Sequence, residues 1–313
     1  MKYDKLCEIL GIQYPIFQGG MAWVADADLA SAVSAAGGLG IIAGMSSNGE
    51  QLRAEIRKLK AKTDKPFAVN IMLMSPFVEE VADVVIEEKV PVVTTGAGNP
   101  VKYMKKWLDA GIKVIPVVSS CALAKMMERN GATAVVAEGS EAGGHIGELT
   151  TMTLIPQIVD TVDIPVVAAG GMVDGRSFLA ALILGASGIQ MGTRFVVAKE
   201  CNVSREYKDR ILKAKDRDTM VTGYRMGHPV RALKSPFTRT LGKAEFDSTK
   251  SMEELEAMGV GALRKAVKDG NAEEGCYMAG ISAGMVNKEE TCSEIIQDMM
   301  KSLDREIQGV KAW

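Results

Sequence analysis

The sequence is poor in aromatic side chains, in paired cysteines and in histidine. Its 313 residues include 7 Phe, 6 Tyr and 3 Trp, and the five cysteines form no C-x-x-C pair. An odd number of scattered cysteines argues against a zinc site or a disulfide framework and favours reduced thiols in a cytoplasm. No window of about 18 uninterrupted apolar residues is present, and the charged N-terminus lacks the apolar core of a signal peptide. We therefore expect no membrane span and a cytoplasmic location.

Positive and negative charges nearly cancel over the whole chain, but they are unevenly distributed along the sequence. The net charge is -2, with 24% charged and 47% hydrophobic residues, which is the composition of a globular protein with a large core. Residues 201–240 nevertheless contain ten Lys or Arg and four Asp or Glu, a net +6, so the remaining chain is about -8. The balance of the whole chain and the few aromatics in this segment argue against nucleic-acid binding.

Eight short apolar runs recur at the spacing of β-α units, and each is followed by glycine or small polar residues. The runs are almost entirely apolar, which is typical of parallel strands covered on both faces. Helical patterns fill the gaps between them, so the sequence predicts an α/β fold, a closed (β/α)8 TIM barrel. The alternative is an open doubly wound sheet, whose G-x-G-x-x-G fingerprint is absent after the first strand. The runs are 14–18, 39–43, 67–71, 91–95, 113–118, 134–138, 165–169 and 188–191.

The β-α rhythm stops after the eighth run. The basic stretch and the residues up to about 275 lack it, and the pattern becomes helical again near the C-terminus, with a final helix expected at about 289–308. We therefore predict a barrel built from residues 1–200 and 276–313, with a smaller basic cap domain inserted at 201–275.

Two glycine-rich turns follow the seventh and eighth predicted strands. Gly170-Gly171 and Gly192-Thr193 lie where many barrels bind phosphate. Backbone N–H groups, a helix N-terminus and the Thr193 hydroxyl can together hold a dianion. The other interpretation is that these glycines only form tight turns. Two such pairs on the two expected strands favour a phosphate ligand.

His145 is the best candidate for proton transfer. It lies in a polar, glycine-rich stretch, 138–147, after the sixth strand, and histidine is the side chain best matched to proton exchange near neutral pH. The other histidine, His228, lies in the basic segment, where shaping the cap is the simpler role. No spacing of His, Cys and carboxylates suggests a metal site. Cys121 is better explained as a packed residue at a helix start than as a nucleophile.

Several motifs resemble one family closely. They are Gln-Gly-Gly-Met at 18–21, Val-Asn at 69–70, the 138–147 stretch ending Gly-Gly-His-Ile-Gly, Pro-Val-Val-Ala-Ala-Gly-Gly at 165–171, Gln-Met-Gly-Thr-Arg-Phe at 190–195 and Gly-His-Pro-Val-Arg-Ala at 227–232. They look like the FMN-dependent enoyl-[acyl-carrier-protein] reductases II (FabK), a branch of the nitronate monooxygenase, or 2-nitropropane dioxygenase-like, barrel family. The resemblance covers essentially the whole chain.

The resemblance implies a cofactor and roles for individual residues. FMN would lie over the barrel mouth and NADH or NADPH would be the electron donor. The residues implied to bind FMN are Gly20 and Met21 beside the ring, Asn70 as a hydrogen-bond partner, Glu138 and Gln190 as ribityl or ring contacts, and Gly170, Gly171, Gly192 and Thr193 at the phosphate. His145 matches the histidine regarded as catalytic, either donating a proton or hydrogen-bonding the thioester oxygen.

The implied reaction is the reduction of a trans-2-enoyl thioester, the last step of fatty-acid elongation. The implied partner is an acidic acyl carrier protein, which the +6 segment is suited to attract, and relatives are commonly homodimers. Two alternatives stay open: a nitronate monooxygenase on the same barrel, and a non-catalytic FMN- or phosphate-binding barrel.

Overall fold

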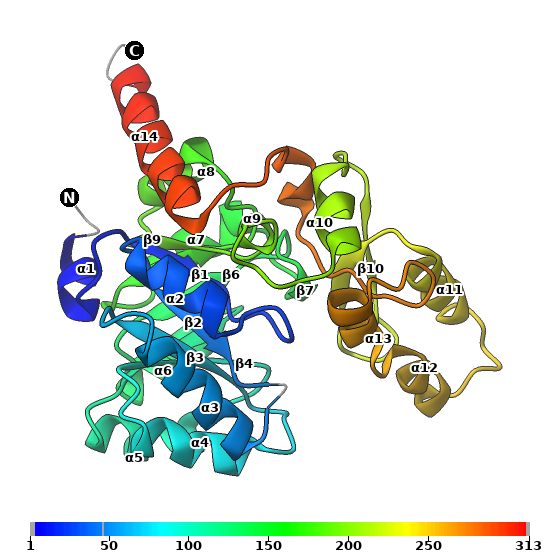
Figure 1. The fold of residues 1–313 in the computed structure, drawn as a ribbon, viewed down its shortest axis with the longest axis horizontal. Coiled ribbons are helices and arrows are strands. Elements are labelled where there is room, and N and C mark those ends of the chain that lie inside the picture. Colours follow the sequence, from blue (N-terminus) through cyan, green and yellow to red (C-terminus); the bar gives the residue numbers. More distant parts are fainter. Residues whose placement is uncertain (1–3, 46, 311–313) are drawn as a thin grey trace.

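The eight predicted strands are present and form one parallel sheet. In the computed structural model, which describes residues 4–45 and 47–310, the strand order is β1-β9-β8-β6-β5-β4-β3-β2. A bridge between Phe17 and Leu39 joins β1 to β2, so the sheet curls into a barrel (Figure 1). The strands are β1 (Ile16–Gln18), β2 (Gly40–Ala43), β3 (Phe67–Met72), β4 (Val92–Gly96), β5 (Lys113–Val118), β6 (Val135–Glu138), β8 (Val166–Ala169) and β9 (Gly188–Met191).

The seam between β1 and β2 is completed by a side chain. The fully buried Gln18 accepts a hydrogen bond from the Ile41 amide (3.0 Å) and donates one to the Ile41 carbonyl (3.2 Å). Its own backbone amide donates to Leu39 O (3.0 Å). The Gln18 amide group therefore replaces the ladder hydrogen bonds that β1, with only three residues, is too short to supply.

Alternation along the strands divides the core into two layers. Phe17, Ile41, Ala68 and Val92 pack in one cluster with Leu6 of α1 (Asp4–Leu10). Their neighbours in sequence, such as Ile16 and Val69, pack in a second cluster with the surrounding helices. Because side chains on a strand alternate in direction, the first cluster is the barrel interior, which α1 covers at one end.

Several barrel helices begin directly after residues that can cap a helix N-terminus. The Asp26 side chain accepts from the Asp28 and Leu29 amides at the start of α2, and Gly37, with φ +94°, follows its end. Capping boxes at Asn48 and Asp174 begin α3 and α8. The helices are α2 (Ala27–Ala35), α3 (Gly49–Lys60), α4 (Val78–Glu87), α5 (Val101–Asp109), α6 (Cys121–Arg129), α7 (Thr151–Val159), α8 (Gly175–Ile183) and α9 (Thr193–Val196).

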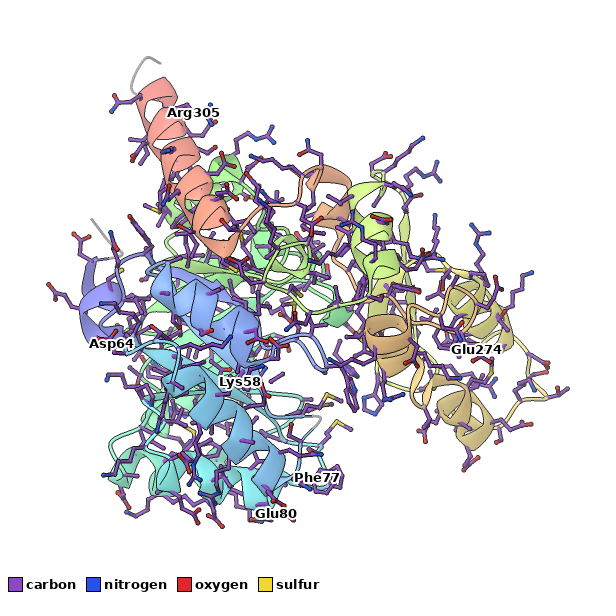
Figure 2. All side chains as sticks on the ribbon, viewed as in Figure 1. Lys58, Asp64, Phe77, Glu80, Glu274 and Arg305 are labelled. Carbon is purple, nitrogen blue, oxygen red and sulfur yellow. The ribbon has the colours of Figure 1, made fainter. Side chains whose placement is uncertain are left out.

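The 201–275 segment forms a group of elements on one side of the barrel (Figure 1). Charged side chains project from both parts, such as Lys58 and Glu80 from the barrel helices and Glu274 from this group (Figure 2). The hairpin of the 201–275 segment pairs with a short strand of the barrel chain to form a second sheet. Its strand order is β10-β11-β7, and all neighbouring strands are antiparallel. The elements are α10 (Arg205–Leu212), β10 (Thr219–Thr222), β11 (Val230–Leu233), α11 (Pro236–Ala244), α12 (Met252–Gly259), α13 (Ala262–Arg264) and the π-helical turn η1 (Lys265–Asp269).

The third strand of this small sheet, β7 (Gly144–His145), belongs to the barrel chain. The sequence predicts only a loop over 138–147, because two residues flanked by glycines carry no strand pattern. Pairing with β11 makes them a strand, so a long-range contact overrides the local signal.

The chain returns to the barrel through residues 276–291, which include the 3₁₀ turn η2 (Ile281–Met285), and ends in α14 (Cys292–Val310). α14 packs on α8, where a Cβ on Gly175 would lie 2.3 Å from the Leu303 amide, so this position requires glycine. No helix among the described residues is long and apolar enough to span a membrane.

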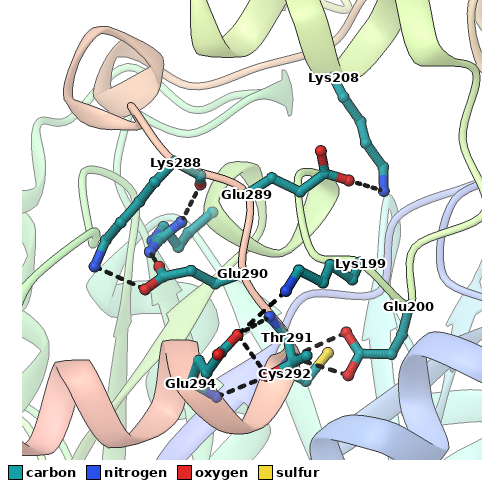
Figure 3. A network of polar contacts seen from close by, with 10 residues as sticks. Lys199, Glu200, Lys208, Lys288, Glu289, Glu290, Thr291, Cys292 and Glu294 are labelled. Carbon is teal, nitrogen blue, oxygen red and sulfur yellow. Dashed lines mark hydrogen bonds and ion pairs between the residues drawn. The ribbon is translucent and has the colours of Figure 1, made fainter.

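A network of ion pairs holds the returning chain (Figure 3). The buried Arg194 of α9 pairs with Glu290 and donates to the Lys288 carbonyl (3.0 Å). The buried Lys208 of α10 donates to Glu289 (3.0 Å) and to the Ala198 carbonyl (2.7 Å). Residues 288–290 are thereby tied to the helices that follow the last barrel strand.

Candidate active site

One cavity of about 420 Å³ lies at the carboxyl ends of the barrel strands. This volume is within the range typical of cofactor sites. All ten residues predicted from the sequence line it, although they come from five barrel strands and from β7. They are Gly20, Met21, Asn70, Glu138, His145, Gly170, Gly171, Gln190, Gly192 and Thr193. The structure brings these residues together, and their individual roles stay predictions.

The two glycine turns offer donors to an anion. Gly170 and Gly171 have φ of +92° and +77°, which a side chain would disfavour. In the part of the chain that the structure describes, the amides of Gly171, Met172 and Thr193 donate to no protein acceptor. The Thr193 hydroxyl accepts from the Gly280 amide (2.9 Å), which leaves its own hydrogen for a ligand. This set of donors is suited to a phosphate group.

Asn70 and Gly20 form a close polar contact on the opposite wall. Asn70 Nδ2 donates to the Gly20 carbonyl (3.1 Å), and a Cβ on Gly20 would lie 2.2 Å from that nitrogen. Asn70 Oδ1 is buried and has no hydrogen-bond partner among the described residues. A buried acceptor that lines a cavity and lacks a donor indicates that a ligand N–H or O–H group belongs there.

Glu138 ends β6 and lines the cavity, and it has no charged partner among the described residues. Burial raises the pKa of its carboxyl to about 7. A carboxyl group whose pKa is higher in the folded than in the unfolded protein contributes its full stabilisation at a pH below its unfolded pKa. This contribution is lost as the pH rises through the folded pKa. For Glu138 the window runs from about pH 4.5 to about pH 7.

Replacing this carboxyl by an amide therefore has a predictable effect on stability. In the flavin-free protein, we expect Glu138→Gln to stabilise the fold by up to about 3 kcal/mol at pH 8 and by little near pH 4.5. Urea unfolding at both pH values measures this difference, with Asp304→Asn on the exposed face of α14 as the control. An equal effect of Glu138→Gln at both pH values would contradict the assigned burial of the charge.

His145 lies on β7 and faces the cavity. Burial lowers the pKa of its imidazole, and the nearby His228 lowers it further. The two rings meet edge to face with centroids 6.5 Å apart. Sequence reasoning gave His228 a shaping role, and no local signal placed it beside His145, because the contact arises from the pairing of β7 with β11.

Hydrogen bonds and close packing with neighbouring elements hold the stretch that carries His145. Glu141 accepts hydrogen bonds from the Thr151 amide and hydroxyl, both at 2.8 Å. A Cβ on Gly139 would lie 2.2 Å from that hydroxyl oxygen, so only glycine fits. The Arg231 guanidinium donates to the Ser140 carbonyl (3.1 Å). These contacts fix the backbone that leads from Glu138 to His145.

The sequence did not predict the part of the cavity wall that residues after the last barrel strand form. The Gly280 amide binds Thr193, the Ile281 amide donates to Glu141 O (3.0 Å), and the Tyr207 hydroxyl donates to Met278 O (2.5 Å). The Met-Ala-Gly sequence at 278–280 was a visible signal for this segment. The residues concerned are Tyr207, Leu263, Met278, Gly280 and Ser282.

The chain is similar to proteins of known families over most of its length. The sequence profile of the nitronate monooxygenase family matches residues 4–84 and 76–302. A (3aS,4S,5R,7aS)-5-hydroxy-7a-methyl-1-oxo-octahydro-1H-indene-4-carboxyl-CoA dehydrogenase from Rhodococcus jostii is 40% identical, over 75% of this chain and 67% of its own. A probable nitronate monooxygenase from Staphylococcus saprophyticus is 35% identical, over 90% and 92% of the two chains. The solved structure of FabK from Thermotoga maritima is 49% identical, with a TM-score of 0.96 and 98% of each chain covered.

Proposed function

The chain belongs to the nitronate monooxygenase family, and from this premise we propose that it is an FMN-dependent enoyl-[acyl-carrier-protein] reductase that uses NADH or NADPH. The observation that carries the proposal is the similarity to FabK, at 49% identity over 98% of both chains. The relative from Rhodococcus jostii, which is named for a carboxyl-CoA substrate, supports a thioester as the substrate class.

The cavity fits FMN at both ends. The turns at 170–171 and 192–193 offer amide donors and the Thr193 hydroxyl for the phosphate. Asn70 offers a buried, unpartnered oxygen for a donor of the flavin ring, and the lack of a side chain at Gly20 lets Asn70 pack against this turn. In this assignment Met21 borders the ring, while Glu138 and Gln190 contact the ring or the ribityl chain.

The bound flavin supplies hydride transfer from the nicotinamide to the β-carbon of the enoyl thioester. The protein must then supply a proton at the α-carbon or a hydrogen bond at the thioester oxygen, and His145 is the titratable group placed for either task. The 278–282 stretch forms part of the cavity wall beside Thr193, on the side assigned to the phosphate.

The proposed partner is an acyl carrier protein, and the proposed oligomer is a homodimer. Of the cations in the 201–240 stretch, Arg205, Lys208 and Arg210 are neutralised by ion pairs. Five others there and Lys243 form no ion pair within the described residues, so they are available to an acidic partner. These are Lys213, Lys215, Arg217, Lys234, Arg239 and Lys243.

Binding through these cations predicts a salt effect that depends on the substrate. Raising the ionic strength from about 0.02 M to about 0.2 M is expected to lower kcat/KM about tenfold for enoyl-acyl-carrier protein, because exposed charges are screened. The coenzyme A analogue should change little. Lys215→Glu should flatten the salt dependence, whereas Lys105→Glu, on the exposed α5 pair, should not. Equal salt dependence for the two substrates would count against the docking surface.

Anaerobic stopped-flow absorbance tests the activity itself. The flavin should be bleached by NADH or NADPH and should recover on mixing with a trans-2-enoyl thioester. The Staphylococcus saprophyticus relative favours a second candidate, the oxidation of nitronates. In that case a nitronate bleaches the flavin, oxygen restores it and the nicotinamides have no effect, which would overturn the reductase proposal.

A further inference from the structure

The only two histidines of the chain meet at the edge of the cavity. Val230 pairs with His145 across the β7–β11 ladder, and the Ile146 amide donates to the Pro229 carbonyl (3.0 Å). His228 directly precedes this pairing, and its ring lies edge to face with that of His145 at 6.5 Å. Backbone hydrogen bonds on both sides therefore hold the contact in place.

The two rings differ in their position relative to the cavity. His145 lines the cavity and is exposed at its mouth, whereas His228, which is also exposed, lies on the β10–β11 turn and is not part of the cavity wall in the described structure. The turn is itself held: the His228 amide donates to Gly223 O (3.1 Å), and the Gly223 amide donates to Glu245. His228 thus combines a fixed position with access to bulk water.

Reduction of the enoyl thioester consumes one proton per turnover, in addition to the hydride. If His145 gives this proton to the α-carbon, it is left neutral at the mouth of the cavity, where bound cofactor and substrate would restrict its own access to solvent. We infer that His228 resupplies the proton to His145 after each turnover. The N–H bond of the His228 imidazolium breaks, an N–H bond forms on His145 through the ring contact or one bridging water, and His228 takes a proton from solvent. No electrons move, and the inference rests on the proposed function.

The charged groups around the two rings do not pair with either imidazole, so each imidazole has the other as its titratable neighbour. Each neighbour that can carry a charge is engaged elsewhere or stands apart: Glu141 on Thr151, Arg231 on Ser140 and Thr219, and Glu245 on Gly223. Within the described residues, neither imidazole forms an ion pair with a carboxylate. The remaining groups on the packed elements are Glu138, Glu148, Tyr224 and Arg225. The lowered pKa of His145 agrees with repulsion from His228.

Single-turnover and steady-state kinetics of His228→Gln separate a proton supply from a structural role. At about pH 6, reoxidation of pre-reduced enzyme by enoyl thioester should be close to the wild-type rate, because His145 equilibrates its proton with solvent before the substrate is added. Steady-state turnover should fall about tenfold or more and recover on addition of imidazole. Tyr224→Phe, on the same exposed turn, should leave both rates unchanged. Wild-type steady-state turnover in His228→Gln, or equal loss in both regimes without rescue, would overturn the inference.

Proton NMR of the tag-free, flavin-free chain tests the coupling without turnover. Only two imidazole signals are expected, and each single variant leaves one, which assigns them. His228→Gln should raise the pKa of His145, and an unchanged pKa would refute the coupling. A wild-type enzyme that shows this coupling but does not reduce enoyl thioesters would instead refute the proposed function, so the two failures are distinguishable.

Discussion

Replacing His145 by alanine is expected to lower turnover of enoyl thioester about 10²- to 10⁴-fold, the contribution of a single positioned acid. FMN binding should be nearly unchanged, because the residues suited to its phosphate and ring lie on other strand ends. Steady-state kinetics with either nicotinamide, together with the flavin content of the purified variant, measure the two effects.

The half-reactions locate the defect. Bleaching of the flavin by the nicotinamide requires no proton from His145 and should proceed at the wild-type rate, whereas reoxidation by enoyl thioester should be slow. Wild-type turnover in His145→Ala would remove this residue from the mechanism. A variant that loses its flavin would show that His145 supports the site rather than the chemistry.

Replacing Glu290 by glutamine is expected to cost about 3 kcal/mol of folding stability, because it leaves a buried guanidinium without its counter-charge. The Arg194 side chain is 6% exposed, and it would keep only neutral acceptors, the Lys288 carbonyl and the amide oxygen of the new glutamine. Arg194 directly follows Thr193, so weaker FMN binding should accompany the loss. Urea unfolding and flavin fluorescence titration measure the two quantities.

A matched exposed pair gives the control for this substitution. Lys105 and Asp109 lie 2.7 Å apart on α5 with side chains 85% and 63% exposed. Asp109→Asn should change stability by no more than about 0.5 kcal/mol, as surface pairs contribute little. If Glu290→Gln were equally mild, the ion pair between Arg194 and Glu290 would not anchor the returning chain.

The barrel was predictable because its signals are local. Each strand is an apolar run covered on both faces, and several helix starts carry a side-chain cap, such as Asp26 at α2. The gathering of His145 and the turns at 170–171 and 192–193 around one cavity was predictable for the same reason, since a parallel barrel gathers all its strand ends at one mouth. The other five candidate residues came from the family resemblance, and the roles of all ten stay predictions.

The contacts that the sequence did not predict are all long-range. β7 is a strand only because β11 lies beside it, and His228 reaches His145 through that same pairing. The wall residues Met278 and Gly280 come from a segment about 130 residues later in the chain than His145. Gln18, placed beside predicted flavin contacts in the sequence, instead closes the β1–β2 seam.

The small sheet has a consequence for how this architecture can be altered. Because the barrel chain itself provides β7, trimming or exchanging the 201–275 segment would expose the edge of the strand that carries His145 and would withdraw His228 at the same time. A chimaera with a different β10–β11 hairpin would also have different groups next to His145. An exchange of the 201–275 segment should therefore include residues 138–147.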